Sequence, residues 1–198
     1  MCQLLETIKL ENGQLFNLSH HNRRLNAARQ ELFQGCPPIN LSAYIQVPEN
    51  CRKGLFRCRV LYSLQIESVE FFAQLPRTFL SLKLVEHNSI DYHLKYADRS
   101  QLTELLAMKG EADEIIIVKN GMLTDCSIGN LVFGDGKNWY SPATPLLAGT
   151  QRQKLLDTGL IKEKNIRPAD LNNYRELGII NAFFDLGNMP RIKISNIF

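Results

Sequence analysis

The sequence predicts an α+β protein with two lobes and a cleft between them. In residues 54–62, a period of two puts Phe56, Cys58, Val60 and Tyr62 on one face and Arg57 and Arg59 on the other, which is the pattern of a half-buried strand. Asn-Gly pairs at 12–13 and 120–121 lie between strand-like segments and predict hairpins, because both residue types tolerate positive φ. Near residues 86–92 the strand-rich pattern gives way to helical segments between hairpins, so we expect the boundary of the lobes there.

The N-terminal lobe is expected at residues 1–88 and begins with a hairpin over residues 3–17. A basic helix follows, with Ser19 as its N-cap and with Leu25, Ala28 and Leu32 on one apolar stripe. The remaining elements of this lobe are a long loop and strands at 54–62, 68–75 and 80–87.

The C-terminal lobe is expected at residues 89–198. The spacing of Leu102, Leu105 and Leu106 predicts a helix over 99–109. The other elements follow in the order hairpin at Asn120-Gly121, hairpin at Asp135-Gly136, helix from Gly149-Thr150, short strand, short helix at 168–174 and strand at 177–186.

Composition predicts a soluble globular protein of the cytoplasm. The hydrophobic share of 44% and the charged share of 22% are ordinary, and the net charge of +3 is spread along the chain, so we expect no nucleic-acid partner. The five cysteines show no CxxC spacing, which favours free thiols in a reducing compartment and no metal site. We find no signal peptide and no apolar run of about 18 residues that could cross a membrane.

Two stretches of the C-terminal lobe are candidates for holding a charged ligand. In "LLAGTQRQ", Gly149-Thr150 opens a helix, whose unpaired N–H groups and positive dipole end suit a phosphate; the alternative is an ordinary helix start. In "TDCSIGN", Asp125 needs a partner if it is buried, and one candidate is a cationic ring nitrogen of a cofactor; the alternative is a turn-forming residue.

The N-terminal part of the chain and its junction with the second lobe offer three more candidates. The stretch "HHNRRL" either binds an anion through arginine or forms a solvated helix face. Arg57 and Arg59 share one strand face and either clamp a substrate carboxylate or form the wet side of the strand. Lys95, between Leu94 and Tyr96, is either a solvated charge or a nucleophile whose pKa desolvation lowers. The residues alone leave these alternatives open.

Taken in order, these stretches resemble the class IV aminotransferase family, whose members are pyridoxal-phosphate enzymes of fold type IV. "HHNRRL" is followed by the arginine-bearing strand, "LKYADR", "TDCSIGN", "PLLAGTQR" and "IINAF". The family includes branched-chain and D-amino-acid aminotransferases and aminodeoxychorismate lyase. The resemblance covers nearly the whole chain and implies two lobes, pyridoxal 5′-phosphate in the cleft between them, an amino-acid or amine substrate and a homodimer.

The resemblance also implies roles for individual residues. Lys95 matches the lysine that forms the Schiff base with pyridoxal phosphate. Asp125 stands where the family usually has a glutamate facing the pyridine nitrogen, and it is one methylene shorter. The remaining matched positions contact the cofactor phosphate and are Arg24, Thr150, Gln151, Asn181 and Ala182.

The expected activity is that of an aminotransferase acting on an amino acid or a related amine through Lys95. The alternative is aminodeoxychorismate lyase, which releases pyruvate and p-aminobenzoate, because the two reactions share their early steps. A non-catalytic homologue that binds pyridoxal phosphate is a second alternative. It is motivated by Asp125 and by the start near "LLET", where we expect the usual N-terminal strand of the family to be missing.

Overall fold

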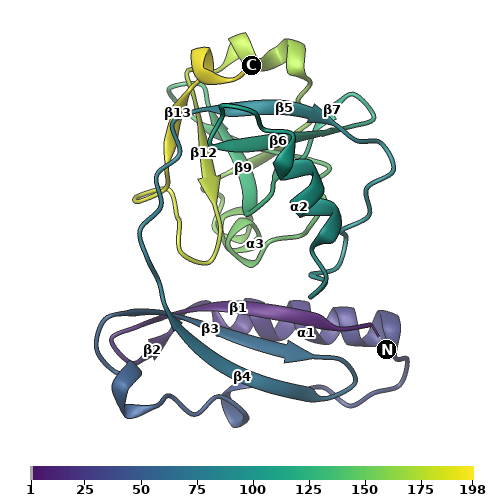
Figure 1. Ribbon diagram of the computed structural model, residues 1–198, viewed down its shortest axis with the longest axis vertical. Helices are drawn as coiled ribbons and strands as arrows, with labels where there is room; N and C mark the ends of the chain where they lie inside the picture. Colours follow the sequence, from purple (N-terminus) through teal and green to yellow (C-terminus); the bar gives the residue numbers. More distant parts are fainter. Residues whose placement is uncertain (1) are drawn as a thin grey trace. The chain divides into compact units, whose positions relative to one another are not determined.

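The computed structural model describes residues 2–198, and the chain divides into two compact units (Figure 1). Unit 1 comprises the residues up to Pro76 together with Leu94–Asp98, and unit 2 comprises Arg77–His93 and Arg99–Phe198. Both units mix helices and strands, as the sequence predicts. The lobes at 1–88 and 89–198 remain a prediction about domains; in the structure, the segment around Lys95 belongs to unit 1.

Unit 1 is a four-stranded antiparallel sheet in the order β2-β1-β3-β4, with the helix α1 (Leu18–Leu32). The turn between β1 and β2 has φ of 49° at Asn12 and 81° at Gly13, which confirms the predicted hairpin. The loop before β3 contains 3₁₀ turns at Leu41–Ala43 and Glu49–Cys51. The strands are β1 (Leu4–Glu11), β2 (Gln14–Leu15), β3 (Leu55–Tyr62) and β4 (Ile66–Ala73).

The register of β1 and β3 explains the core of unit 1. Leu4 pairs with Tyr62 and Ile8 with Cys58, so one face of these strands is apolar apart from Glu6. This face packs against α1 through Leu25, and α1 runs along the sheet in Figure 1. The other members of this core are Ala28, Ile39, Leu41, Ile45, Val60 and Leu94.

Two details of α1 correct the sequence prediction. The helix begins at Leu18, its N-cap is Asn17 with φ of 55°, and no side chain caps it, so the predicted cap at Ser19 is wrong. Leu18 packs against the core of unit 1, and the helix starts two residues earlier than a cap at Ser19 implies. Leu32, predicted on the apolar stripe, is 37% exposed.

Unit 2 contains two sheets and two α-helices. The larger sheet follows the order β11-β10-β9-β12-β13, with β8 also paired to β9, and the smaller sheet follows β5-β6-β7. The helices are α2 (Ser100–Ala107) and α3 (Thr150–Asp157), and 3₁₀ segments lie at Pro168–Asn173 and Ile194–Asn196. The strands are β5 (Leu82–Glu86), β6 (Glu114–Lys119), β7 (Met122–Leu123), β8 (Asp125–Cys126), β9 (Gly129–Gly134), β10 (Trp139–Pro142), β11 (Lys162–Lys164), β12 (Glu176–Ile180) and β13 (Arg191–Lys193).

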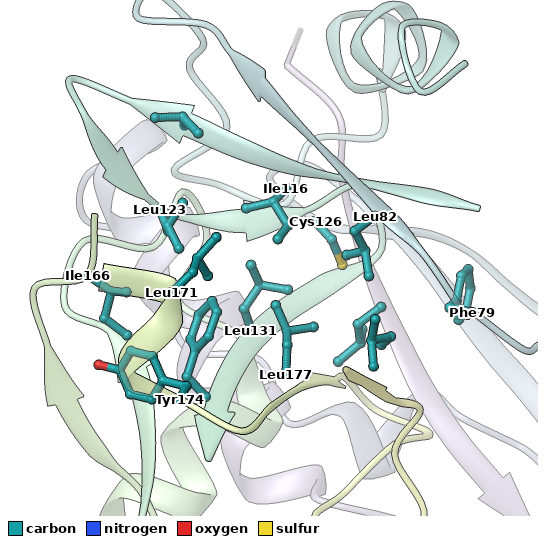
Figure 2. Close-up of a cluster of buried hydrophobic side chains, with 14 residues drawn as sticks. Phe79, Leu82, Ile116, Leu123, Cys126, Leu131, Ile166, Leu171, Tyr174 and Leu177 are labelled. Carbon is teal, nitrogen blue, oxygen red and sulfur yellow. The ribbon is translucent and has the colours of Figure 1, made fainter. Parts of the chain in front are cut away.

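The core of unit 2 lies between its two sheets (Figure 2). Leu82 and Ile116 from the smaller sheet meet Leu131 and Leu177 from the larger one. Both hairpins predicted here are confirmed, since β6 pairs with β7 and β9 with β10. The last predicted strand is wrong beyond Ile180, because the side chain of Asn181 accepts hydrogen bonds from the backbone N–H groups of Phe183 and Phe184 and turns the chain.

Replacing Leu131, which is fully buried in this core, by alanine should lower the free energy of unfolding by about 2–5 kcal/mol, because it leaves a cavity. Leu80 in the same unit is 67% exposed, so Leu80→Ala is the matched control and should change that free energy by no more than about 0.5 kcal/mol. Urea denaturation of both variants measures the difference. Equal losses would show that Leu131 does not support the core in this way.

Candidate active site

Lys95 lies in a short segment that extends the sheet of unit 1. Its carbonyl accepts a hydrogen bond from Leu5 at 2.9 Å, and Tyr96 forms an antiparallel bridge with Leu4. The N–H of Tyr96 also donates to the carbonyl of Leu94 at 2.9 Å, so Lys95 is the central residue of a three-residue turn. Leu94 and Tyr96 pack into the core of unit 1, and the lysine between them is half-buried. The apolar neighbours noted in the sequence are therefore the anchors of this turn.

Arg24 belongs to a buried polar cluster between β1 and α1. Its Nε donates to Oε1 of Glu6 at 2.9 Å, and its Nη2 donates to Oε2 at 2.5 Å. Nδ1 of His21 lies 2.6 Å from the same Oε2. Glu6 and His21 are almost completely buried, and the side chain of Arg24 is 14% exposed. Of the polar residues in "HHNRRL", the helix buries His21, leaves Arg24 half-buried and exposes Arg23.

The electrostatics of this cluster make Glu6 an anion and His21 a neutral ring. Burial alone raises the pKa of Glu6, but the charge of Arg24 and the hydrogen bond with His21 outweigh it and hold that pKa at about 2. Burial lowers the pKa of His21, and the charges of Arg24 and Lys95 lower it further, against the effect of Glu6. Both cations thus act on the same imidazole, so unit 1 brings Arg24 and Lys95 into one neighbourhood.

Asp125, on β8, clamps the loop that precedes α3. Its Oδ2 accepts the N–H of Leu147 at 2.9 Å, and its Oδ1 accepts Nδ2 of Asn130 at 2.8 Å. The same Nδ2 donates to the carbonyl of Leu147 at 2.8 Å. Both backbone groups of Leu147 are therefore held by two side chains that β8 and β9 position.

Burial raises the pKa of Asp125 to about 6, against the hydrogen bonds from Leu147 and Asn130 and the charge of Arg152. Among residues 2–198, no lysine, arginine or histidine forms an ion pair with this carboxylate. A buried carboxylate that neutral donors hold can still accept a cation. This environment fits the ring-nitrogen partner proposed from the sequence.

The helix α3 begins where the sequence predicts, with Gly149 as N-cap and Thr150 as its first residue. Thr150 and Gln151 are both buried. A Cβ at position 149 would overlap Oδ1 of Asn130, so only glycine lets the loop approach β9 this closely. Asn130 thus contacts both Asp125 and the N-terminus of α3, so the two lie side by side.

Asn181 and Ala182 follow β12 in a tight turn. Besides accepting the two backbone hydrogen bonds that close this turn, Asn181 donates from Nδ2 to the carbonyl of Ile128 at 3.3 Å. Ile128 lies in the turn between β8 and β9, close to Asp125 in sequence. Ala182 is half-buried. A hydrogen bond therefore joins the turn at Asn181 to the turn between β8 and β9, which follows Asp125.

Arg57 and Arg59 share the face of β3 opposite α1, as the sequence predicts, but their partners differ. Arg59 forms an ion pair with Glu70 on β4 at 3.2 Å. The guanidinium of Arg57 lies over the ring of Phe72 at 5.0 Å, and its buried Nε has no hydrogen-bond partner in the described part of the chain. Arg57 is thus the better candidate for an external anion.

Sequence reasoning missed Glu6 and Asn130. The signal for Glu6 was available, because it occupies a position between Leu4 and Ile8 on the buried face of a strand. The partners of Asn130 at Asp125 and Leu147 are set by tertiary contacts that no local pattern reveals. In the part of the chain that the structure describes, no group of His, Cys, Asp and Glu could hold a metal ion, and no helix is long and apolar enough to span a membrane.

The family model for amino-transferase class IV matches residues 3–190. The chain belongs to the class IV aminotransferase family. It is therefore a pyridoxal-phosphate-dependent enzyme with the fold of that family, and its substrate is a small molecule. The residues present fit this cofactor by their chemistry: an amine at Lys95, a guanidinium at Arg24, a helix N-terminus at Thr150 and a buried carboxylate at Asp125.

Individual relatives of this class IV chain have similar length. A Haemophilus influenzae protein named "Uncharacterized protein" is 42% identical over 184 residues, which cover 92% of this chain and 98% of the relative. A crystal structure from Haemophilus somnus 129pt, named "putative 4-amino-4-deoxychorismate lyase", is 38% identical with a TM-score of 0.87, covering 92% of this chain and 96% of the other.

More distant structures share the fold. A Mesorhizobium loti structure named "putative amino-acid aminotransferase" is 20% identical with a TM-score of 0.83, covering 100% of this chain and 100% of the other. The pyridoxal-phosphate-bound form of a Mycobacterium tuberculosis "hypothetical aminotransferase" is 17% identical with a TM-score of 0.76, covering 96% of this chain and 80% of the other.

The raised pKa of Asp125 predicts a stability contribution that depends on pH. Its folded pKa of about 6 exceeds the ordinary value of 3.8, so the contribution is complete below pH 3.8 and is lost as the pH rises through 6. Between pH 7 and pH 5 it should increase the free energy of unfolding of the cofactor-free protein by roughly 1.4 kcal/mol.

The lowered pKa of His21 acts in the opposite direction over the same interval, so the Asp125 contribution must be isolated. We therefore compare the free energies of unfolding of the protein and of Asp125→Asn in urea at both pH values. A difference between the two proteins that does not change with pH would contradict the raised pKa.

Proposed function

We propose that the protein is an aminotransferase in which Lys95 is the covalent anchor of pyridoxal phosphate and the substrate is an amine that carries a carboxylate. The observation that carries this proposal is that the family match includes Lys95 and Arg24, which both contact β1: the N–H of Leu5 donates to the carbonyl of Lys95, and Arg24 donates to Glu6. The amine that anchors the cofactor and a cation for its phosphate are thus supplied by one unit. The predicted cleft and the predicted homodimer remain proposals.

The phosphate is assigned to Arg24 and to the beginning of α3. A guanidinium donates parallel hydrogen bonds to a phosphate, and the N–H groups of the first helical turn add to them. Thr150 and Gln151 are the first two residues of that turn. The turn at Asn181 and Ala182 is the remaining proposed phosphate contact, supported by its hydrogen bond to the segment that follows Asp125.

Asp125 is assigned to the ring nitrogen of the cofactor. A carboxylate there keeps a proton on that nitrogen, and the bound cofactor then supplies an electron sink for the substrate. Asp125 is one methylene shorter than the glutamate of the family pattern, and the Leu147 clamp fixes its carboxylate close to β9. Lys95 would hold the cofactor through its aldehyde, and as a free amine it would move the proton at the substrate Cα.

The substrate carboxylate is assigned to the strand face of Arg57 and Arg59. Because Glu70 already neutralises Arg59, the stacked guanidinium of Arg57 is the stronger candidate of the two. This assignment keeps the substrate class to amino acids and related amines with a carboxylate.

Aminodeoxychorismate lyase activity is the second candidate. It is favoured by the name of the Haemophilus somnus structure, which is 38% identical to this chain. The two activities differ in what they require. The lyase releases pyruvate and p-aminobenzoate from aminodeoxychorismate alone, whereas an aminotransferase needs a 2-oxo acid to accept the amino group.

Lys95→Ala should abolish covalent attachment of pyridoxal phosphate, because it removes the reacting amine. The measurement is borohydride reduction of the loaded protein followed by peptide mass mapping, together with the absorbance band near the visible edge. Lys9, another lysine of unit 1, forms an ion pair with Glu11 at 2.8 Å, so Lys9→Ala is the matched control and should keep the adduct. An adduct that persists in Lys95→Ala would mean that another lysine is the anchor.

Two assays then separate the candidate activities. The loaded protein is given aminodeoxychorismate without a 2-oxo acid, and separately a panel of amino donors with 2-oxoglutarate. Turnover only in the second assay supports the aminotransferase, and pyruvate formation in the first supports the lyase. If the wild type carries the Lys95 adduct and turns over none of these substrates, both proposed activities are wrong for these substrates and the non-catalytic alternative gains support.

A further inference from the structure

Glu6 is the most deeply buried charge of unit 1, and no step of the proposed reaction uses it. Its neighbours in the alternation of β1 are Leu4 and Ile8, which lie in the apolar core. An ionised carboxylate in such a place is tolerated only when its partners satisfy it. Both partners come from α1, at positions 21 and 24, which are three residues apart and share one helix face.

The geometry of the pair fixes the plane of the Arg24 guanidinium. Nε and Nη2 donate to the two oxygens of Glu6 at 2.9 Å and 2.5 Å, which is the parallel, bidentate arrangement of an arginine and a carboxylate. The guanidinium is planar, so this pairing sets the direction of all its other N–H bonds. His21 then fixes the carboxylate itself, through the 2.6 Å contact of its Nδ1 with Oε2.

The charge of the cluster argues against a purely electrostatic role for Glu6. With Glu6 ionised, Arg24 charged and His21 neutral, the three side chains have no net charge. The carboxylate therefore weakens the attraction of Arg24 for an anion, and charge alone predicts that its removal tightens phosphate binding. A role in orientation predicts the opposite, so the two explanations differ in sign.

We propose that Glu6 is a positioning residue that orients the guanidinium of Arg24 toward the cofactor phosphate. This inference rests on the proposed function, in which Arg24 binds that phosphate. His21 supports the same arrangement by holding the carboxylate through a contact of its own.

The test compares the affinity for pyridoxal phosphate with that for pyridoxal, which lacks the phosphate. Both form the same bond with Lys95, so the phosphate site is isolated by one ratio, the Kd for pyridoxal divided by the Kd for pyridoxal phosphate. In Glu6→Gln this ratio should fall about tenfold, the value of one misdirected hydrogen bond to a charged group. Fluorescence titration of the cofactor-free protein measures both constants without any assay of turnover.

Glu6→Asp is the second variant, and it keeps the charge while being too short to hold both Arg24 and His21 in the same way. The ratio of Kd values should fall in this variant as well. Glu6→Asp therefore keeps the test decisive if Glu6→Gln does not fold. Glu70→Gln removes a carboxylate that pairs with Arg59 in the same unit, and as the matched control it should leave the ratio unchanged.

An unchanged or increased ratio in the Glu6 variants would overturn the inference, as would a full wild-type ratio in Glu6→Asp. Equal losses of affinity for both ligands would also overturn it, because they indicate a general structural defect. The proposed function fails separately: a wild-type protein that binds pyridoxal phosphate no more tightly than pyridoxal has no phosphate site at Arg24, whatever the Glu6 variants do.

Discussion

The hydrogen bonds that hold both backbone groups of Leu147 are the constraint on which unit 2 depends. Asp125 accepts its N–H, and Asn130 donates to its carbonyl. These contacts bring the loop before α3 against β9, so closely that residue 149 must be glycine. The position of the helix N-terminus is therefore decided by side chains of β8 and β9, and the helix itself has no side-chain cap.

Glu6 in unit 1 and Asp125 in unit 2 are both deeply buried carboxylates, and they are stabilised in different ways. Glu6 is paired with Arg24 and is an anion throughout the physiological pH range, with a pKa of about 2. Burial raises the pKa of Asp125 to about 6, because the neutral donors in direct contact with it lower that pKa less than burial raises it. The first arrangement suits a fixed structural charge, and the second leaves a carboxylate that gains stability when a cation binds beside it.

Much of the fold could be predicted from the sequence, because its strongest signals are local. The Asn12-Gly13 and Asn120-Gly121 turns and the start of α3 depend on the backbone preferences of a few adjacent residues. The start of α1 could not be predicted in the same way, since packing of Leu18 decides it. In the site, residue types and their order identified the family. The contact of Glu6 with Arg24 joins residues 18 positions apart, and that of Asp125 with Leu147 joins residues 22 positions apart. Contacts of that range follow from the fold and leave no mark in a short motif.

The chain passes between its two units three times, and this has a consequence for folding. Unit 1 is complete only when Leu94–Asp98 has paired with the first strand, through the hydrogen bond of Leu5 with Lys95 and that of Ala97 with Gln3. Some 90 residues separate these partners, so their contact closes a long loop and carries a corresponding entropic cost. A nascent chain that ends before residue 94 lacks this segment. Lys95, the proposed anchor of the cofactor, can therefore reach its place in unit 1 only after Arg24 and α1 have been synthesised.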